Sequence, residues 1–194
     1  MLRQLYQDLK RNYRPERNLI SNLGRSSFHP DFLVVFLYRT ASTLYKLRLP
    51  VLPRIVWLLV RIVFCCDIDF RCEIMEGCLL RHALGIVIGK DVRIGAGVTI
   101  YQQTTLGGNL GKLRELDGRV VSQPVIEDGV VILPGAKVLG PVHIGRAAII
   151  GSNAVVTRDV PSDCIAVGQN QISPLKDVAF HRYNSASGEK NAQS

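Results

Sequence analysis

Branched apolar residues recur every six positions between residues 126 and 156, and a small or branched apolar residue follows each of them four positions later. A period of six matches neither the helical period of about 3.6 residues nor the two-residue alternation of a plain strand. It is typical of a parallel β-helix, in which each six-residue unit supplies a short strand and a corner, and three units close one triangular coil. The inward-pointing positions of this pattern are Ile126, Ile132, Val138, Ile144, Ile150 and Val156, with Val130, Ala136, Val142, Ala148, Ala154 and Val160.

The same period extends upstream and is interrupted twice. Six-residue spacing holds from Ile68 to Leu80 and again from Ile88 to Leu106, with a slip of two residues between the two series. His82 lies in this slip, and a second interruption spans residues 107–125, a stretch of Gly, Lys, Arg, Glu and Asp without a repeat. Insertions project from a regular stack without disturbing it, so both interruptions are candidate places for chemistry. We count twelve hexads between residues 67 and 161, enough for about four coils.

The segment before the repeats has a helical pattern. Residues 2–13 are amphipathic, apolar residues recur at intervals of three and four after Pro30, and Pro53 opens a third, strongly apolar stretch. We therefore expect a mainly β protein with a short N-terminal α-helical segment, residues 1–64. A β-helix with the loop 107–125 follows over residues 65–168, and residues 169–194 form a polar tail that we expect to be largely disordered.

Charge is distributed unevenly along the chain. Residues 1–64 hold 11 Lys or Arg against 3 Asp or Glu, and thus the whole net charge of +8, whereas residues 65–194 hold 13 of each sign. Such a basic, apolar segment can contact an anionic membrane surface, but we favour packing against the β-helix or a second subunit. The uncharged run between Arg54 and Arg61 is too short to span a bilayer. Nucleic acid is not an expected partner, because no recognisable binding module accompanies the charge.

The five cysteines are odd in number and contain no Cys-x-x-Cys pair. Cys72 and Cys78 fall at small, inward positions of their hexads, which predicts buried free thiols. Free thiols and the lack of a signal sequence predict a cytoplasmic protein, with the inner face of the plasma membrane as a further location if the basic segment binds lipid. Only His82 and His143 lie in the repeats, so we expect no metal site.

His82 is the strongest candidate for catalysis. An imidazole can take a proton from a hydroxyl group near neutral pH, and a carboxylate on its other ring nitrogen fixes the tautomer and raises the basicity. Asp67 precedes His82 by fifteen residues, which places it on the neighbouring coil once the slip is allowed for. The alternative interpretation of His82 is an ordinary surface histidine at a corner.

The string Leu80-Arg81-His82-Ala83-Leu84-Gly85-Ile86-Val87-Ile88-Gly89, followed by Thr105-Leu106-Gly107-Gly108, resembles the serine acetyltransferase branch of the hexapeptide-repeat acyltransferases. The resemblance covers residues 30–170. It implies a left-handed β-helix, a homotrimer, acetyl-CoA as donor, His82 as general base and Asp67 as its partner. It further implies that the cofactor lies in a groove between two β-helices, where backbone amides stabilise the oxyanion. The implied cofactor-binding residues are Gly107, Gly108, Pro134, Lys137 and Ser152.

Two positions depart from the pattern of true serine acetyltransferases. Arg81 stands where they usually have an aspartate that holds the substrate ammonium group, and Gln123 lies where they carry an Arg-His pair that helps with the carboxylate. A cation at position 81 would repel an ammonium group by about 1 to 4 kcal/mol, depending on the local dielectric. Together with the shortened basic N-terminus, these changes suggest a closer likeness to exopolysaccharide O-acetyltransferases of the colanic-acid type. We therefore expect a small or lipid-linked saccharide acceptor, contacted by Arg81 and Gln123.

Two alternatives stay open. The first keeps the same chemistry with L-serine as acceptor, in cysteine biosynthesis, and Arg81 argues against it without excluding it. The second is a non-catalytic trimeric scaffold that binds a partner through its basic helices. His82 and the Thr-Leu-Gly-Gly string make this scaffold the weakest of the three readings.

Overall fold

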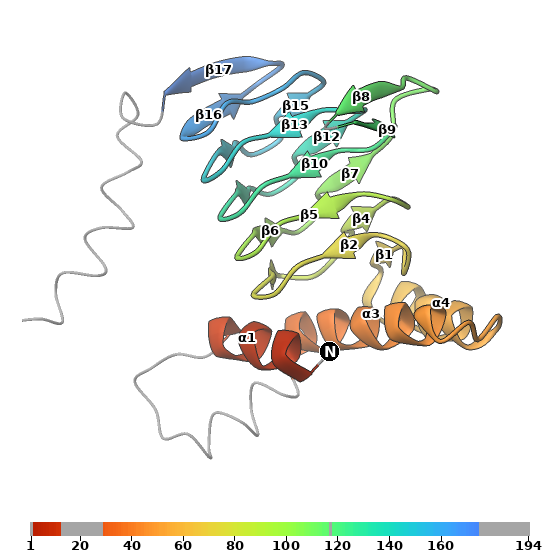
Figure 1. Cartoon of the computed structure of the whole chain (residues 1–194). Coiled ribbons are helices and arrows are strands. Elements are labelled where there is room, and N and C mark those ends of the chain that lie inside the picture. Colours follow the sequence, from red (N-terminus) through yellow and green to blue (C-terminus); the bar gives the residue numbers. More distant parts are fainter. Residues whose placement is uncertain (1, 13–28, 117, 175–194) are drawn as a thin grey trace, which may run out of the picture.

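The computed structural model describes residues 2–12, 29–116 and 118–174. Three helices, α1 (Leu2–Asn12), α3 (Pro30–Lys46) and α4 (Leu52–Phe64), precede the strands and form a layer beneath the first coil of the β-helix (Figure 1). Proline occupies the first turn of both α3 and α4, where its missing N–H has no helical partner to lose. The helical expectation for the N-terminal segment is therefore confirmed where the structure describes it.

Three parallel sheets form the faces of a left-handed β-helix, which confirms the predicted fold class. The first sheet contains β1 (Asp67–Ile68), β4 (Val87–Ile88), β7 (Thr105–Gly107), β12 (Lys137–Leu139) and β15 (Val155–Val156). The second contains β2 (Glu73–Ile74), β5 (Arg93–Ile94), β10 (Val125–Ile126) and β13 (His143–Ile144). The third contains β3 (Leu79–Arg81), β6 (Thr99–Tyr101), β11 (Val131–Ile132), β14 (Ile149–Ile150), β16 (Cys164–Val167) and β17 (Gln171–Pro174).

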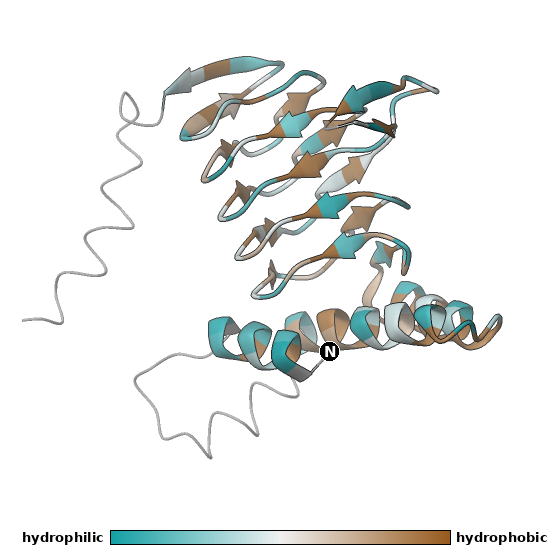
Figure 2. Ribbon diagram, in the orientation of Figure 1, coloured by the Kyte–Doolittle hydropathy of each residue, from teal (hydrophilic) through white to brown (hydrophobic). Residues whose placement is uncertain are grey.

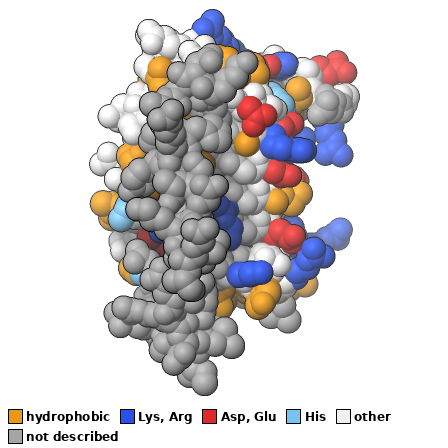
Figure 3. All heavy atoms as spheres, turned by 90° about the vertical axis from the view of Figure 1, so that its left-hand side faces the viewer, with side chains coloured by type: hydrophobic (Ala, Val, Ile, Leu, Met, Phe, Trp, Pro, Cys, Tyr) orange, Lys and Arg blue, Asp and Glu red, His pale blue; other side chains and the backbone are white. Residues whose placement is uncertain are grey.

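The predicted inward positions form the core. Equivalent residues of successive coils pair directly, as Ile132 does with Ile100 and with Ile150. Each of the three sheets therefore contributes one column of apolar side chains to the interior. These side chains are fully buried, and Figure 2 shows hydrophobic residues recurring from coil to coil along the strands. By contrast, the charged side chains on the face seen in Figure 3 include both signs and gather along one edge.

The β-helix is longer than the hexad count predicts. The first sheet has five strands, and the fifth, β15, which holds the regularly spaced Val156, opens a fifth coil whose other two faces leave the six-residue spacing. In this coil Val160 makes only an isolated bridge to Ile144, and the next strand, β16, starts at Cys164 and so breaks the spacing. Strand β17 then turns back antiparallel to β16, so structure extends past the predicted boundary at residue 168. The rest of the predicted tail, residues 175–194, lies outside the described residues.

The loop 107–125 is a projecting hairpin made by β8 (Arg114–Leu116) and β9 (Arg119–Val121). Arg114 Nη1 donates to both carboxylate oxygens of Asp159, each at 2.6 Å, and the His143 N–H donates to Asp159 Oδ1 at 2.9 Å. Partial burial acts to raise the pKa of Asp159, but these hydrogen bonds outweigh it and leave that pKa below its ordinary value. The hairpin is thus tied to a coil two turns further on.

Buried thiols are the predicted state of Cys72 and Cys78, and the structure confirms it. Burial raises the pKa of each of these two thiols to about 12. Because the thiolate is the reactive form, both should resist a thiol reagent in the folded protein. We expect Cys65, which is exposed, to react rapidly with dithionitrobenzoate, and Cys72 and Cys78 to react only after unfolding in urea. Loss of the rapid phase in Cys65→Ser is the check, and rapid labelling of Cys72 or Cys78 would contradict the burial.

Within the described ranges, no helix has the length and apolar character needed to cross a membrane. In the same residues no group of three or more His, Cys, Asp or Glu side chains is arranged to hold a metal ion.

Candidate functional site

The corner that follows the third sheet carries His82 and two of the other predicted site residues, and a third predicted residue begins the next strand. Backbone hydrogen bonds join the corners of successive coils: Gln103 N–H to Leu84 O, Gly135 N–H to Gln102 O, and Asn153 N–H to Pro134 O, at 2.8 to 3.0 Å. We call this column of corners the histidine edge; it consists of residues 82–86, 102–104, 134–136 and 152–154. It therefore contains His82, Pro134 and Ser152, and Lys137 begins the strand directly after it.

Lys137 is bound to this edge by its own side chain. Its Nζ donates to the backbone carbonyl of Gln103 at 2.5 Å. The ammonium group therefore lies over the corner one coil above His82, where an anionic ligand running along the edge would meet it.

The backbone of His82 is held in an unusual conformation. His82 has φ of 52°, in the left-handed region that residues with a β-carbon rarely adopt. Asp31, the second residue of α3, accepts hydrogen bonds from the His82 N–H at 3.2 Å and the Ala83 N–H at 2.8 Å. Two successive amides that converge in this way form an anion-binding nest, and the buried carboxylate of Asp31 fills it. The imidazole of His82 remains exposed to solvent.

Asp31 was not among the predicted site residues. An acidic residue in the first turn of a helix is common because it complements the helix dipole, so its sequence position gave no sign of a contact 51 residues away. The structure shows that it links the helical layer to the backbone of the proposed base.

We expect Asp31→Ala to lower the rate of the reaction that depends on His82. Loss of the carboxylate leaves the buried Ala83 amide and the partly buried His82 amide without their acceptor and frees the left-handed corner. A misplacement of about 1 Å can cost about a hundredfold in rate. Steady-state kinetics should show the loss mainly in kcat, while Asp31→Asn, which keeps one acceptor oxygen, should lose less. Equal loss in both variants, or a change confined to KM, would contradict this positioning role.

Asp67 lies beneath the same corner, but its side chain is bound by residues of the helical layer. Its N–H donates to Ile86 O at 2.8 Å, so its backbone is paired with the segment that follows His82. Its carboxylate accepts a hydrogen bond from Trp57 Nε1 at 2.9 Å and lies 3.4 Å from Arg61 Nη1, both on α4. The hydrogen bonds of the described residues include none between Asp67 and the His82 imidazole. Trp57 and Arg61 are four residues apart on α4, so they lie on one face of the helix and reach the same carboxylate.

Gly107, Gly108 and Gln123 lie at the opposite edge of the first sheet. We call this the loop edge; it is marked by Gly89, Gly107 and Gly140, which are joined by backbone hydrogen bonds to the coils on either side. A β-carbon on Gly108 would lie 3.0 Å from Gln123 Nε2, so the glycine lets this amide approach closely. Gln123 Oε1 is buried and has no hydrogen-bond partner among the described residues. One β-helix thus does not bring these three residues together with His82.

Arg81 ends β3 beside His82, and its side chain is exposed. Water therefore screens its charge, and its repulsion of an ammonium group takes the lower end of the predicted range, about 1 kcal/mol.

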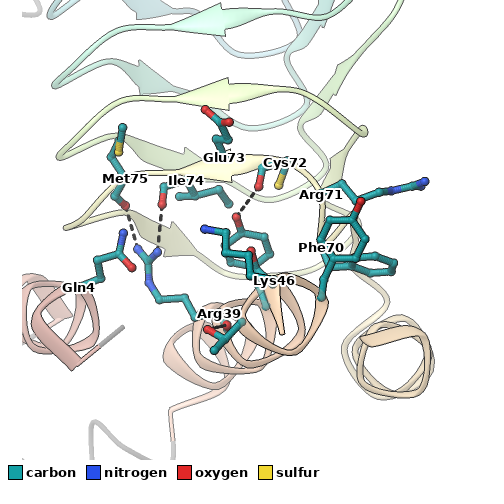
Figure 4. Close-up of a pocket in the computed structure, with 13 residues that line it drawn as sticks. Gln4, Arg39, Lys46, Phe70, Arg71, Cys72, Glu73, Ile74 and Met75 are labelled. Atoms are coloured by element: carbon teal, nitrogen blue, oxygen red, sulfur yellow. Dashed lines mark hydrogen bonds between the residues drawn. The ribbon is translucent and has the colours of Figure 1, made fainter. Parts of the chain in front are cut away.

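A separate pocket lies between the helical layer and the first coil (Figure 4). Arg39 points from α3 to the carbonyls of Ile74, at 3.0 Å, and Met75, at 2.8 Å, and Tyr38 donates to the carbonyl of Cys72 at 2.7 Å. The residues that line it include neither His82 nor Asp67. Arg39 and Tyr38 join α3 to the first coil there, and the pocket is lined by none of the predicted site residues, so we assign it no part in the chemistry.

Comparison with known proteins identifies relatives of the chain. A family model described as bacterial transferase hexapeptide (six repeats) matches residues 123–158. A serine acetyltransferase of Helicobacter pylori strain 26695 is 36% identical over 149 residues, which cover 77% of this chain and 84% of the relative. A serine acetyltransferase of Synechococcus elongatus is 40% identical over 140 residues, 72% of this chain, but the match spans only 55% of that protein's length.

Solved structures agree with these relatives. Soybean serine acetyltransferase complexed with serine superposes with a TM-score of 0.76 and 31% identity, over 88% of this chain and 68% of the other. The Neisseria gonorrhoeae serine acetyltransferase in complex with serine gives a TM-score of 0.76 and 29% identity, over 89% and 68%.

These relatives contradict the prediction of a sugar acceptor, and none of them supports the closer likeness to exopolysaccharide enzymes. The error came from giving one charge too much weight. An exposed guanidinium at position 81 changes the electrostatic energy of an ammonium substrate only modestly, so it is a poor basis for rejecting an amino acid.

Proposed function

Because the chain belongs to the serine acetyltransferase family of the hexapeptide-repeat transferases, we propose that it transfers the acetyl group of acetyl-CoA to the hydroxyl group of L-serine. The family agrees with the predicted O-acetyltransferase and implies acetyl-CoA as donor. The observation that carries the proposal is the exposed imidazole of His82 on an edge that also carries Lys137, Pro134 and Ser152.

In the proposed reaction His82 acts as general base. Its imidazole takes the proton of the serine hydroxyl as the oxygen attacks the carbonyl carbon of the thioester. The carbon–sulfur bond then breaks, and the imidazolium returns the proton to the departing thiolate of coenzyme A. The ester and the free thiol are the products, and the imidazole is regenerated without any other reactant.

Three further groups have proposed roles. Lys137 and the corners at Pro134 and Ser152 would hold the pantetheine arm and phosphates of acetyl-CoA along the histidine edge. Asp67 would steady the imidazole, since a carboxylate has lone pairs beyond those used by Trp57 and Arg61. The unpartnered Gln123 Oε1 would accept a hydrogen bond from the substrate ammonium group.

A homotrimer is part of the proposal. His82 and Gln123 lie at opposite edges of the first sheet in one β-helix, so a complete site requires the histidine edge of one copy to meet the loop edge of another. A closed ring of three copies would form three such sites by repeating one heterologous contact. We also place the protein in the cytoplasm, since its thiols are free.

The test is turnover of acetyl-CoA with L-serine, followed by chromatography of coenzyme A and mass spectrometry of the acetylated product. Direct detection avoids the background that the exposed Cys65 would give in a thiol assay. D-serine and a sugar nucleotide serve as control acceptors. Formation of O-acetyl-L-serine supports the proposal, whereas acetyl-CoA binding without turnover of L-serine would overturn it.

A further inference from the structure

The turn between α3 and α4 exposes a row of large apolar side chains. We call residues 45–55 the α3–α4 tip. Leu47 is 65% exposed, Val51 57% and Ile55 56%, and Leu49 and Leu52 are also exposed. Figure 1 shows that this turn forms one end of the helical layer, away from α1. The apolar surface continues along α4 through Leu58, Leu59, Ile62 and Val63, all exposed.

Helix α4 is amphipathic: Arg54 and Arg61, seven residues apart, lie on one exposed face, but a second exposed face is apolar. Pro53 and Val60 are buried against the rest of the protein, while the outward-facing Leu59 and Ile62 are exposed. The apolar face of an amphipathic helix is normally covered, whereas this face of α4 is not. The α3–α4 tip therefore requires a partner with an apolar component.

The charge around the tip indicates that the partner is also anionic. Residues 32–66 contain five Lys or Arg and no Asp or Glu. Arg39 is paired with Asp8, and Arg61 lies 3.4 Å from Asp67. The remaining three, Lys46, Arg48 and Arg54, take part in none of the ion pairs found among the described residues.

These three cations converge on one open pocket of about 840 Å³ beside the tip. Arg71 and the aromatic residues Tyr45, Trp57 and Phe70 also line it. Its one acidic residue, Asp69, is neutralised by Arg71, which donates to it at 2.9 and 2.6 Å. The pocket is thus cationic, with aromatic walls, and directly adjoins the exposed leucines.

From these observations we propose that the α3–α4 tip docks on an anionic lipid bilayer. The exposed apolar side chains enter the acyl boundary, and Lys46, Arg48 and Arg54 bind headgroup phosphates. A symmetric contact between two copies would bring the same cationic patch to face itself, which opposes that occupant. The described helices cannot cross a membrane, so the docking is peripheral. This proposal does not depend on the acetyl transfer.

The test uses the full chain and flotation with vesicles of phosphatidylcholine, with and without phosphatidylglycerol. We expect binding to the anionic vesicles alone, and weaker binding as salt is added. Removing the three cations, Lys46→Gln, Arg48→Gln and Arg54→Gln, should weaken binding about a hundredfold, since each is expected to contribute about fivefold. Leu47→Ser with Val51→Ser should weaken it without a change in charge.

A matched control removes three exposed cations elsewhere, Lys112→Gln, Arg119→Gln and Arg146→Gln, and should bind like the wild type. Equal loss in this control would show general charge attraction and overturn the proposal. It would also be overturned if the wild type stayed at the bottom with both kinds of vesicle. A third contrary result is a larger assembly in sedimentation velocity that the serine variant loses while no vesicle binding is seen, because a second copy would then be the occupant.

Discussion

Replacement of His82 by asparagine is expected to lower kcat for acetyl transfer to L-serine by about 10² to 10⁴, the usual contribution of a positioned general base. Asparagine removes the base but tolerates the left-handed conformation that His82 adopts, with φ of 52°. The hydrogen bonds from residues 82 and 83 to Asp31 use backbone amides and are retained. The variant therefore tests the imidazole and leaves the corner intact.

The measurement is steady-state kinetics on His82→Asn and His82→Ala, with thermal melting of each. The KM for acetyl-CoA should change little, because Lys137 and the upper corners of the histidine edge are untouched. His82→Ala should show the same loss in kcat together with a slightly lower melting temperature, since alanine is poorer in the left-handed region. Wild-type kcat in His82→Asn would exclude His82 as the base and leave only the architecture of the site.

The six-residue period made the β-helix predictable, because each inward position is fixed by its own spacing and needs no knowledge of distant contacts. The prediction failed where the spacing itself changes. After Val156 the fifth coil contributes one isolated bridge at Val160 and then an irregularly placed strand, so a count of regular hexads stops too early. The local sequence pattern therefore predicted the three sheets of the β-helix but not its number of coils.

The candidate site was predictable only in part, for a related reason. His82, Pro134 and Ser152 are stacked by the repeat, so their common edge follows from spacing alone. The groups that act on them from the helical layer do not follow, because the position of α3 and α4 on the first coil is set by tertiary packing. Asp31 beneath His82, and Trp57 and Arg61 on Asp67, are contacts of this kind.

The buried ion pair between Asp8 of α1 and Arg39 of α3 carries the largest expected effect on stability. Arg39 Nε lies 2.5 Å from Asp8 Oδ2, and both side chains are almost completely buried. Arg39 also donates to Ile74 O and Met75 O, and the Cys78 N–H donates to Asp8 Oδ1 at 3.1 Å. One network thus joins two helices to the first coil.

Asp8→Ala is expected to lower the free energy of unfolding by about 3 to 5 kcal/mol, because it leaves a buried guanidinium without its counter-ion. Urea unfolding at a fixed protein concentration measures this, since assembly would otherwise shift the midpoint. Asp8→Leu with Arg39→Met should cost less than the sum of the two single changes, because the double variant buries no unpaired charge. The exposed pair of Arg3 and Glu76, 3.4 Å apart, is the control, and Arg3→Ala should change stability by less than about 1 kcal/mol. A similarly small effect of Asp8→Ala would mean that α1 is not held to the β-helix by this pair, and that the helical layer owes its position to the contacts of α3 and α4 with the first coil.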